Sequence, residues 1–190
     1  MDLDAIDAET KLVPSWRLGD RNAITAQAFI SDLQSRLANR VQLTTDGNRL
    51  YLDTIADNFT EIDYAMLQKI YGSAGSGPES RYSPGVCRGI KKETIAGNPD
   101  PEFISTSYAE RQNLNIRMKN RRFTRLTNAF SKKAENLGHS IALDFMHHNF
   151  CRVHQTLKTT PARAIGIEKR TWKIRDIVEL LPAACHLEKF

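Results

Sequence analysis

Strand-like and helix-like segments alternate through the first 70 residues, and this order constrains the fold more than any other feature of the chain. Residues 11–18 and 41–45 carry the β-branched and apolar side chains typical of strands. Each is followed by a stretch whose apolar residues recur at helical spacing, over residues 24–37 and 51–59. Residues 62–71 then regain strand character. The alternation predicts a mixed α/β sheet covered by helices.

The chain divides by composition into three parts. Residues 1–71 hold the alternating segments, including an initial pair of strands, although residues 65–69 would equally suit a helical turn. Residues 72–104 are rich in Gly, Ser and Pro and predict a long exposed loop, with a short hairpin around residues 86–90. Residues 105–190 predict a helical part.

The net charge of +5 over 190 residues hides an asymmetry between the two ends of the chain. Residues 1–70 hold 7 Lys and Arg against 11 Asp and Glu, whereas residues 71–190 hold 20 against 11. Within residues 110–135 there are eight basic residues and two glutamates. Such a density attracts polyanions and gives salt-dependent binding. Composition alone leaves a nucleic-acid contact and an ordinary solvated helix face equally open.

The sequence predicts no membrane span and no export. No apolar run approaches the roughly 20 residues that cross a bilayer. The acidic residues Asp2 and Asp4 stand where a secretory signal would carry basic ones. The three cysteines, at wide spacing, form no disulfide framework. We therefore expect a cytoplasmic protein.

Asp46 is the first candidate for chemistry. It ends the predicted strand at residues 41–45 and comes before Gly47. Acidic residues at the carboxyl ends of strands lie where α/β sheets hold their ligands. Asp-Gly is also a common turn dipeptide, and taken alone the turn is the stronger interpretation.

Glu110 is the second candidate. The run Ser107-Tyr-Ala-Glu110 has the spacing of a capping box, in which a serine caps a helix and a glutamate reaches back to the cap. A cap explains Glu110 without any metal. It does not explain the polar and basic residues that follow, from Arg111 to Arg117.

Three motifs together resemble the signatures of insertion-sequence transposases with a DDE catalytic core. They are Thr44-Thr-Asp-Gly47, then Ser107-Tyr-Ala-Glu-Arg-Gln-Asn113 with Arg117, and Asn149-Phe-Cys-Arg-Val-His154-Gln-Thr-Leu157 before Thr160-Pro-Ala162. The resemblance covers nearly the whole chain. It implies a ribonuclease H-like fold, shared with retroviral integrases, and DNA transposition by metal-dependent phosphoryl transfer at transposon ends.

The resemblance also assigns metal ligands. In the family three carboxylates hold two Mg²⁺ or Mn²⁺ ions, which stabilise the attacking and leaving oxygens of the displacement. Asp46 matches the second carboxylate and Glu110 the third. Residues 72–101 would be an insertion between them. We therefore expect Asp46 and Glu110 to converge on a divalent ion.

The first family carboxylate has no clear match. It lies on a first strand, and the segment that follows this strand in the family resembles Ile6–Lys11 here. The resemblance thus implies that residues 1–71 form an incomplete ribonuclease H-like sheet lacking its first strand. Asp2 and Asp4 could be proposed as substitutes, but their position argues against it. We expect a truncated copy that is catalytically impaired.

The basic region gains a role from the resemblance, because family members lay helical surface against the DNA backbone here. The implied DNA contacts are Arg111, Arg117, Lys119, Arg121, Arg122 and Arg125. Implied partners are transposon-end and target DNA, in the bacterial nucleoid, and a homo-oligomer or a mixed assembly with a full-length transposase. His154 is expected to be neutral and structural, donating to a carbonyl.

Two other functions stay open at this stage. One is a non-catalytic DNA-binding or partner-binding remnant that interferes with a full-length transposase. The other is a generic α/β enzyme in which Asp46 is a turn residue and Glu110 a cap. Binding of a divalent ion and of DNA would separate them.

Overall fold

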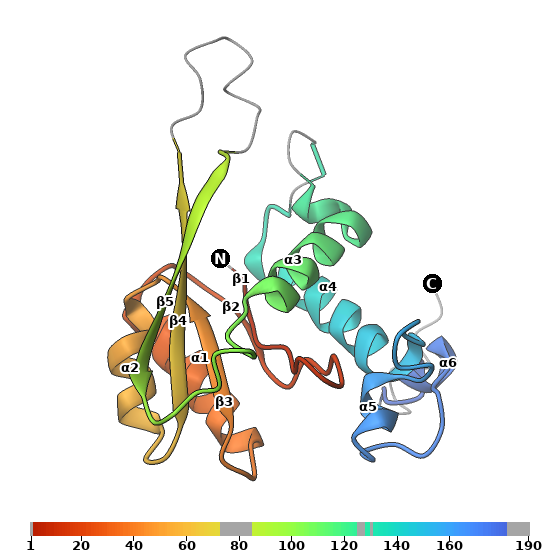
Figure 1. Ribbon diagram of the computed structural model, residues 1–190. Helices are drawn as coiled ribbons and strands as arrows, with labels where there is room; N and C mark the ends of the chain where they lie inside the picture. The colour runs from red at the N-terminus through yellow and green to blue at the C-terminus, as the bar shows by residue number, and fades with distance from the viewer. Residues whose placement is uncertain (1, 73–84, 125–127, 130, 182–190) are drawn as a thin grey trace. The chain divides into compact units, whose positions relative to one another are not determined.

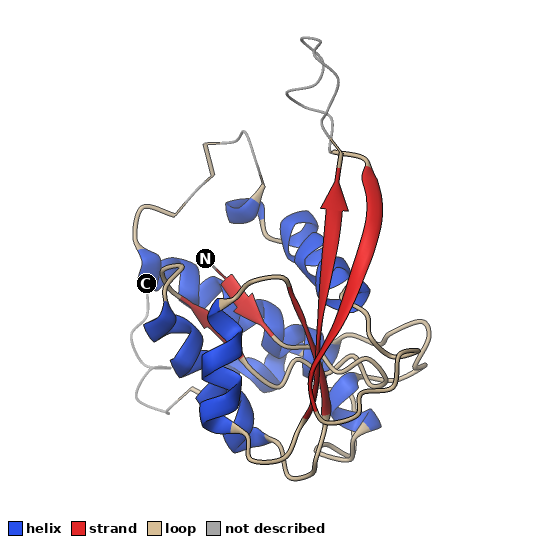
Figure 2. Cartoon of the chain, turned by 60° about the vertical axis from the view of Figure 1, so that its left-hand side comes forward, coloured by secondary structure: helices blue, strands red, loops and turns tan. Residues whose placement is uncertain are grey.

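The computed structural model describes residues 2–72, 85–124, 128–129 and 131–181 (Figure 1). Strands and helices follow one another along the chain, with helices dominating the second half. Figure 2 distinguishes the helices from the strands by colour. The elements are β1 (Asp2–Asp4), β2 (Trp16–Leu18), α1 (Ala23–Arg36), β3 (Gln42–Asp46), α2 (Leu50–Asn58), β4 (Asp63–Tyr71), β5 (Cys87–Ala96), α3 (Ser107–Lys119), the 3₁₀ turn η2 (Arg121–Phe123), α4 (Ala134–Met146), the π-helical turn η3 (His147–Cys151), α5 (Pro161–Ala164) and α6 (Ile174–Val178).

The chain forms two compact units. Unit 1 contains Gly19–Ser107. Unit 2 combines two segments far apart in the sequence, Asp2–Leu18 and Tyr108–Phe190. Each unit is described by itself below.

Unit 1 is built on a three-stranded mixed sheet. The strand order is β3-β4-β5, with β3 parallel to β4 and β4 antiparallel to β5. The side chain of Asn22 caps α1 by accepting a hydrogen bond from the Thr25 N–H at 2.9 Å. α1 buries one apolar face and packs against α2. The parallel pairing places Asp46, the last residue of β3, opposite Leu67 of β4.

Unit 2 packs a short hairpin against helices. β1 and β2 pair antiparallel, and the loop between them supplies Val13 to a core shared with Ile116 of α3 and Phe145 of α4. The Asn149 side chain holds this loop, since its Oδ1 accepts from the Val13 N–H at 3.0 Å and its Nδ2 donates to the Val13 carbonyl at 2.9 Å. Two distant chain segments thereby share one core.

The α/β class and most element positions agree with the sequence analysis. Strands occupy Trp16–Leu18, Gln42–Asp46 and Asp63–Tyr71, and helices occupy Ala23–Arg36 and Leu50–Asn58. The helical alternative for residues 65–69 is wrong, because these residues lie in β4. Within the described residues, every helix is too short or too polar to cross a bilayer.

The prediction that all strands of residues 1–71 belong to one sheet is wrong. β1 and β2 form their own two-stranded sheet and belong to unit 2. The physical reason is the apolar content of the hairpin, because Ile6, Trp16 and Leu18 pack against the core of α3 and α4. Of the first 71 residues, only β3 and β4 contribute to the mixed sheet.

The exposed insertion loop predicted for residues 72–104 is wrong over much of its length, although residues 73–84 lie outside the described part. Cys87–Ala96 forms the whole of β5, far longer than the expected hairpin. The chain after β5 is fixed to β3 by the Gln42 side chain. This side chain accepts a hydrogen bond from the Asp100 N–H at 2.8 Å and donates one to the Asp100 carbonyl at 3.0 Å. Ile104 is buried against β4.

Candidate functional site

Asp46 lies exposed at the carboxyl end of β3, in unit 1. Its Oδ1 accepts a hydrogen bond from the Asn48 N–H at 3.1 Å, and the Asn48 Oδ1 in turn accepts from the Leu50 N–H at 3.2 Å. These two bonds turn the chain from β3 into α2. The carboxylate therefore shapes a turn and is still presented to solvent.

Tyr64 is a neighbour of Asp46 that the sequence analysis missed. Its hydroxyl lies 2.8 Å from the Thr45 hydroxyl, beneath the end of β3. Burial raises the pKa of Tyr64, the Thr45 hydrogen bond opposes this, and the Asp46 charge adds to it. The phenol thus stays protonated and can act only as a neutral hydrogen-bonding group near this carboxylate. No motif signals it, because it depends on the register of β4 against β3.

Glu110 lies exposed on the first turn of α3, in unit 2. This helix begins at Ser107, whose N–H donates to the Ser105 Oγ at 3.2 Å. Glu110 and Arg117 are seven residues apart, so they occupy nearly the same helix face about 10 Å apart along the axis. The carboxylate and the cation thus belong to one surface.

Most of the predicted DNA contacts lie on one continuous exposed segment. Arg111, Arg117 and Lys119 lie on α3, and Arg121 and Arg122 lie in η2. All five are exposed, whereas Gln112 and Ile116 of α3 are buried. We call these five cations the basic segment. The sixth predicted residue, Arg125, lies outside the described residues.

Asn120 fixes the turn inside the basic segment, and the sequence analysis missed it. Its side-chain oxygen accepts from the Arg122 N–H at 3.1 Å, which caps η2. Its amide nitrogen donates to Ser140 and to Asp144 of α4, both at 2.7 Å. Because Asn120 is buried, these bonds hold η2 against α4 and set the direction of Arg121 and Arg122. An asparagine after a helix that ends in Lys119 is the only sequence signal for this role.

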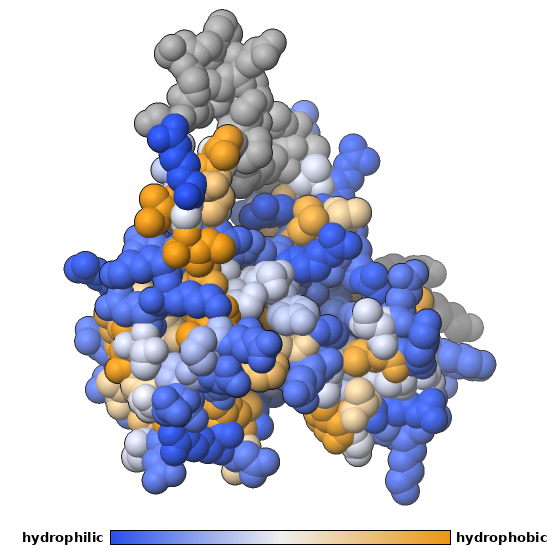
Figure 3. Space-filling view, viewed as in Figure 1, coloured by the Kyte–Doolittle hydropathy of each residue, from blue (hydrophilic) through white to orange (hydrophobic). Residues whose placement is uncertain are grey.

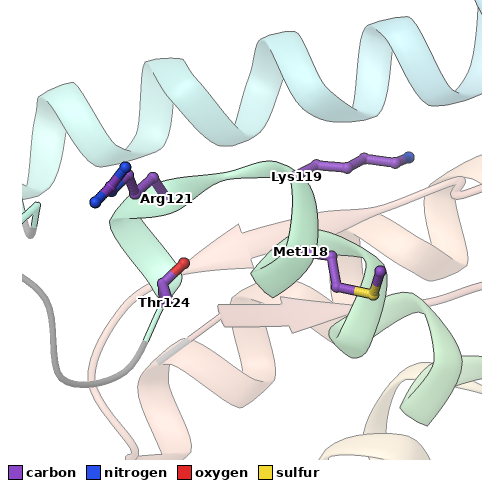
Figure 4. Close-up of a pocket in the computed structure, with 4 residues that line it drawn as sticks. All are labelled: Met118, Lys119, Arg121 and Thr124. Atoms are coloured by element: carbon purple, nitrogen blue, oxygen red, sulfur yellow. The ribbon is translucent and has the colours of Figure 1, made fainter.

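An open pocket of about 290 Å³ lies at this turn, lined by Met118, Lys119, Arg121 and Thr124. Figure 4 shows the Lys119 and Arg121 side chains pointing in opposite directions from the turn. The two cations therefore do not converge on a single point of the pocket.

Lys119 also faces other cations. Although its side chain is exposed, partial desolvation of the ammonium lowers the pKa of Lys119, and the nearby Arg152 guanidinium lowers it further, while Asp144 opposes the shift. Like charges held this close repel one another.

A pair of histidines lies beside this cationic group. The buried His148 has its Nε2 2.8 Å from the Lys11 carbonyl, and the His154 ring packs edge-on against it with centroids 4.7 Å apart. Burial lowers the pKa of His148 to about 4, and burial and Arg152 also lower the pKa of His154. The backbone of His148 opposes this shift in the pKa of His154, and the expected structural role of His154 stays a prediction.

The two candidate carboxylates belong to different units, Asp46 to unit 1 and Glu110 to unit 2. Their expected convergence on a divalent ion therefore stays a prediction. Among the described residues, no group of three or more His, Cys, Asp or Glu side chains is arranged to hold a metal ion.

Comparison with protein-family models, with curated proteins and with solved structures finds no match to this chain.

Proposed function

We propose that this chain is part of a DDE-type transposase with a ribonuclease H-like core, and that it binds double-stranded DNA through the basic segment. The resemblance of three motifs motivates the proposal. The order β3-α2-β4 and the parallel pairing of β3 with β4 are compatible with that core, whereas β1 and β2 lie in a separate sheet.

The observation that carries the DNA-binding part is the exposed basic segment on a fixed turn. Five cations follow one another on α3 and η2, and Asn120 ties the turn to α4. Because the backbone of this turn is already fixed, binding to phosphates needs little ordering of the backbone there. Phosphate contacts of this type supply affinity without sequence information.

Asp46 and Glu110 suit a hard divalent cation in ligand type, since both present exposed carboxylate oxygens. Mg²⁺ bound there would stabilise charge on the oxygens of a phosphoryl transfer. Two carboxylates are fewer than the three that the family uses. We therefore propose that residues 1–190 bind such an ion weakly and do not cleave or join DNA ends by themselves.

A second function has one specific observation in its favour. The Asp46 carboxylate already accepts the Asn48 N–H in a turn, a role that needs no metal. This favours a non-catalytic DNA-binding protein that keeps the basic segment, and that could interfere with a complete transposase by mixed assembly. It differs from the first proposal only in metal binding.

Fluorescence anisotropy with a 30-base-pair duplex of arbitrary sequence tests the DNA-binding proposal. We expect the triple variant Arg117→Gln, Arg121→Gln and Arg122→Gln to lower the slope of log K against log salt by about 3, since each phosphate contact contributes about 0.9. The control variant replaces Arg21, Arg163 and Lys169 with Gln, since these three cations are exposed and lie outside the basic segment. Equal slopes for the two triple variants would reject the interface.

Metal titration separates the two functions. The transposase proposal expects weak Mn²⁺ binding that is lost in both Asp46→Asn and Glu110→Gln, detected by calorimetry on the full chain. Asp53→Asn, an exposed carboxylate on the first turn of α2, is the control. Salt-sensitive DNA binding with no metal dependence would favour the non-catalytic function.

A further inference from the structure

Among the described residues of unit 1, no layer covers the far part of the β4–β5 hairpin. β3 pairs only with Asp63–Leu67, so β4 beyond Leu67 has β5 as its sole described strand neighbour. Figure 1 shows the two strands extending past α1, α2 and β3 as a narrow ribbon. We call residues 68–72 and 85–92 the β4–β5 arm.

Both faces of the arm are exposed to solvent. Residues opposite each other in an antiparallel pair share a face, so Lys69 and Ile90 lie on one face and Gln68 and Lys91 on the other. Of these four, three are exposed and Lys69 is half-buried. A sheet that packed on a core through one face would show alternating burial, which β5 lacks over most of its length.

The arm is cationic. It contains Lys69, Arg88, Lys91 and Lys92 and no acidic residue, and Glu93 follows directly after it. Lys91 pairs with Glu93 at 2.8 Å, and Lys92 donates to the Pro101 carbonyl at 2.7 Å. The Arg88 side chain lies across Gly72, where a Cβ would overlap its guanidinium.

Large apolar side chains alternate with these cations. Ile70, Tyr71, Val86 and Ile90 are each more than half exposed, the highest being Val86 at 75 %. Figure 3 shows apolar side chains gathered along this ribbon. An exposed patch that combines apolar and cationic groups is typical of a binding surface.

Charge decides which partner fits the arm. A second copy of the arm would bring four further cations against the first four, with one glutamate on each side to offset them. Duplex DNA instead offers a phosphate on each strand every 3.4 Å along the axis, and its major groove, about 12 Å wide, admits a two-stranded β-ribbon. Apolar side chains on such a ribbon can contact base edges and thymine methyl groups.

We propose that the β4–β5 arm is a second DNA-binding element, which lies in a groove of the duplex while its cations contact the flanking phosphates. This inference rests on the proposed DNA-binding function. It adds a contact in unit 1 to the basic segment in unit 2, and neither contact depends on a metal ion.

The test uses the full chain and the same 30-base-pair duplex. The arm variant carries Lys69→Gln, Arg88→Gln, Lys91→Gln and Lys92→Gln. We expect the slope of log K against log salt to fall by about 3 to 4 units. The matched control neutralises Arg21, Arg163, Lys169 and Arg175, and it should keep nearly the wild-type slope.

Hydrogen–deuterium exchange on the unmodified chain covers the case in which the arm variant fails to fold. DNA should slow exchange of the backbone amides in residues 68–72 and 85–92. Unchanged exchange there, with a wild-type salt slope in a folded arm variant, would overturn the inference.

These experiments distinguish failure of the arm inference from failure of the proposed DNA-binding function. If the wild-type chain binds DNA and only the basic-segment variant loses affinity, the arm inference fails and the proposed function stands. If the wild-type chain does not bind DNA, both fail. Concentration-dependent sedimentation that the arm variant abolishes would assign the arm to a second copy, and arm-dependent binding to anionic phosphatidylglycerol vesicles but not to DNA would assign it to a membrane. Either result overturns the inference.

Discussion

His148 is a buried base whose neighbours oppose its protonation. The ring lies between the loop that contains Lys11 and the turn that contains His154, and Lys119 and Arg152 are close enough to lower its pKa. The Nε2–H donates to the Lys11 carbonyl in the neutral tautomer. A proton on this ring would add a charge to a group that is already cationic, so the folded state keeps the ring neutral.

We expect acid to destabilise unit 2 through this residue. Burial lowers the pKa of His148 from 6.5 to about 4, so between these values the unfolded chain binds a proton that the folded chain does not. The contribution is complete above pH 6.5, declines as the pH falls, and has vanished at about pH 4. Its size is on the order of 3 kcal/mol.

Urea unfolding from pH 4 to 8, followed by fluorescence, measures this effect, because both tryptophans, Trp16 and Trp172, lie in unit 2. His148→Gln should unfold at lower urea than wild type at pH 7 and should show a flatter pH profile. His139→Gln, at an exposed position of α4, should keep the wild-type profile. A profile equally steep in His148→Gln would contradict the assignment.

At the scale of elements, the turn after β5 depends on a glycine. Gly97 has φ +66°, and a Cβ there would meet the Ile62 carbonyl oxygen at 2.5 Å. The turn then follows Asp63, whose Oδ1 accepts from the Asn98 N–H at 2.7 Å and whose carboxylate also pairs with the Arg40 guanidinium. The backbone has to pass this close for the loop to return to the sheet.

We expect Gly97→Ala to destabilise unit 1 by about 2 kcal/mol or more, because the substitution combines an unfavourable φ with a clash against backbone. Gly89→Ala is the control, since its Cβ would meet nothing within 4 Å. It should change the free energy of unfolding by less than about 0.5 kcal/mol. Hydrogen exchange in residues 42–67 provides the measurement, and equal protection in the two variants would show that the turn can relax.

Elements that follow strong local rules could be predicted from the sequence. Asn22 is a good N-cap, and α1 begins directly after it. β5 could be predicted only in part, because its isoleucines, Ile90 and Ile95, are five residues apart and its cations resemble those of a loop. A strand that is exposed on both faces lacks the alternation of apolar and polar residues by which strands are recognised in a sequence.

The candidate site also contains residues that the sequence locates and residues that it does not. Asp46 and the basic segment could be located from motifs and charge density. Tyr64 and Asn120 could not, because their roles depend on strand register and on hydrogen bonds to α4. Residues that position a site act through tertiary contacts, which a single sequence does not display.

At the scale of the whole molecule, unit 2 is assembled from segments separated by 89 residues. Val13 from the first segment is 4 % exposed and contributes to the same core as Ile116, Ile141 and Phe145 from the second. Sequence patterns give no warning of this division, because a strand pair placed before a helix is equally compatible with the neighbouring sheet.

We expect Val13→Ala to weaken helices more than 90 residues away. Removing two buried methyl groups should lower the free energy of unfolding of unit 2 by about 2 kcal/mol. Amide exchange in α3 and α4 should rise accordingly. The control is Ile24→Ala, at a side chain that is 80 % exposed on α1, and exchange in α3 and α4 that is no faster in Val13→Ala than in this control would contradict the shared core.

Because unit 2 combines two distant segments, its first segment is synthesised well before the second one. Trp16 leaves the ribosome long before Phe145, the aromatic ring against which it packs with centroids 5.8 Å apart. At translation rates of 5–20 residues per second, the delay is roughly 10 s. For that interval the apolar side chains of the hairpin, Ile6, Trp16 and Leu18, have no native surface to cover them.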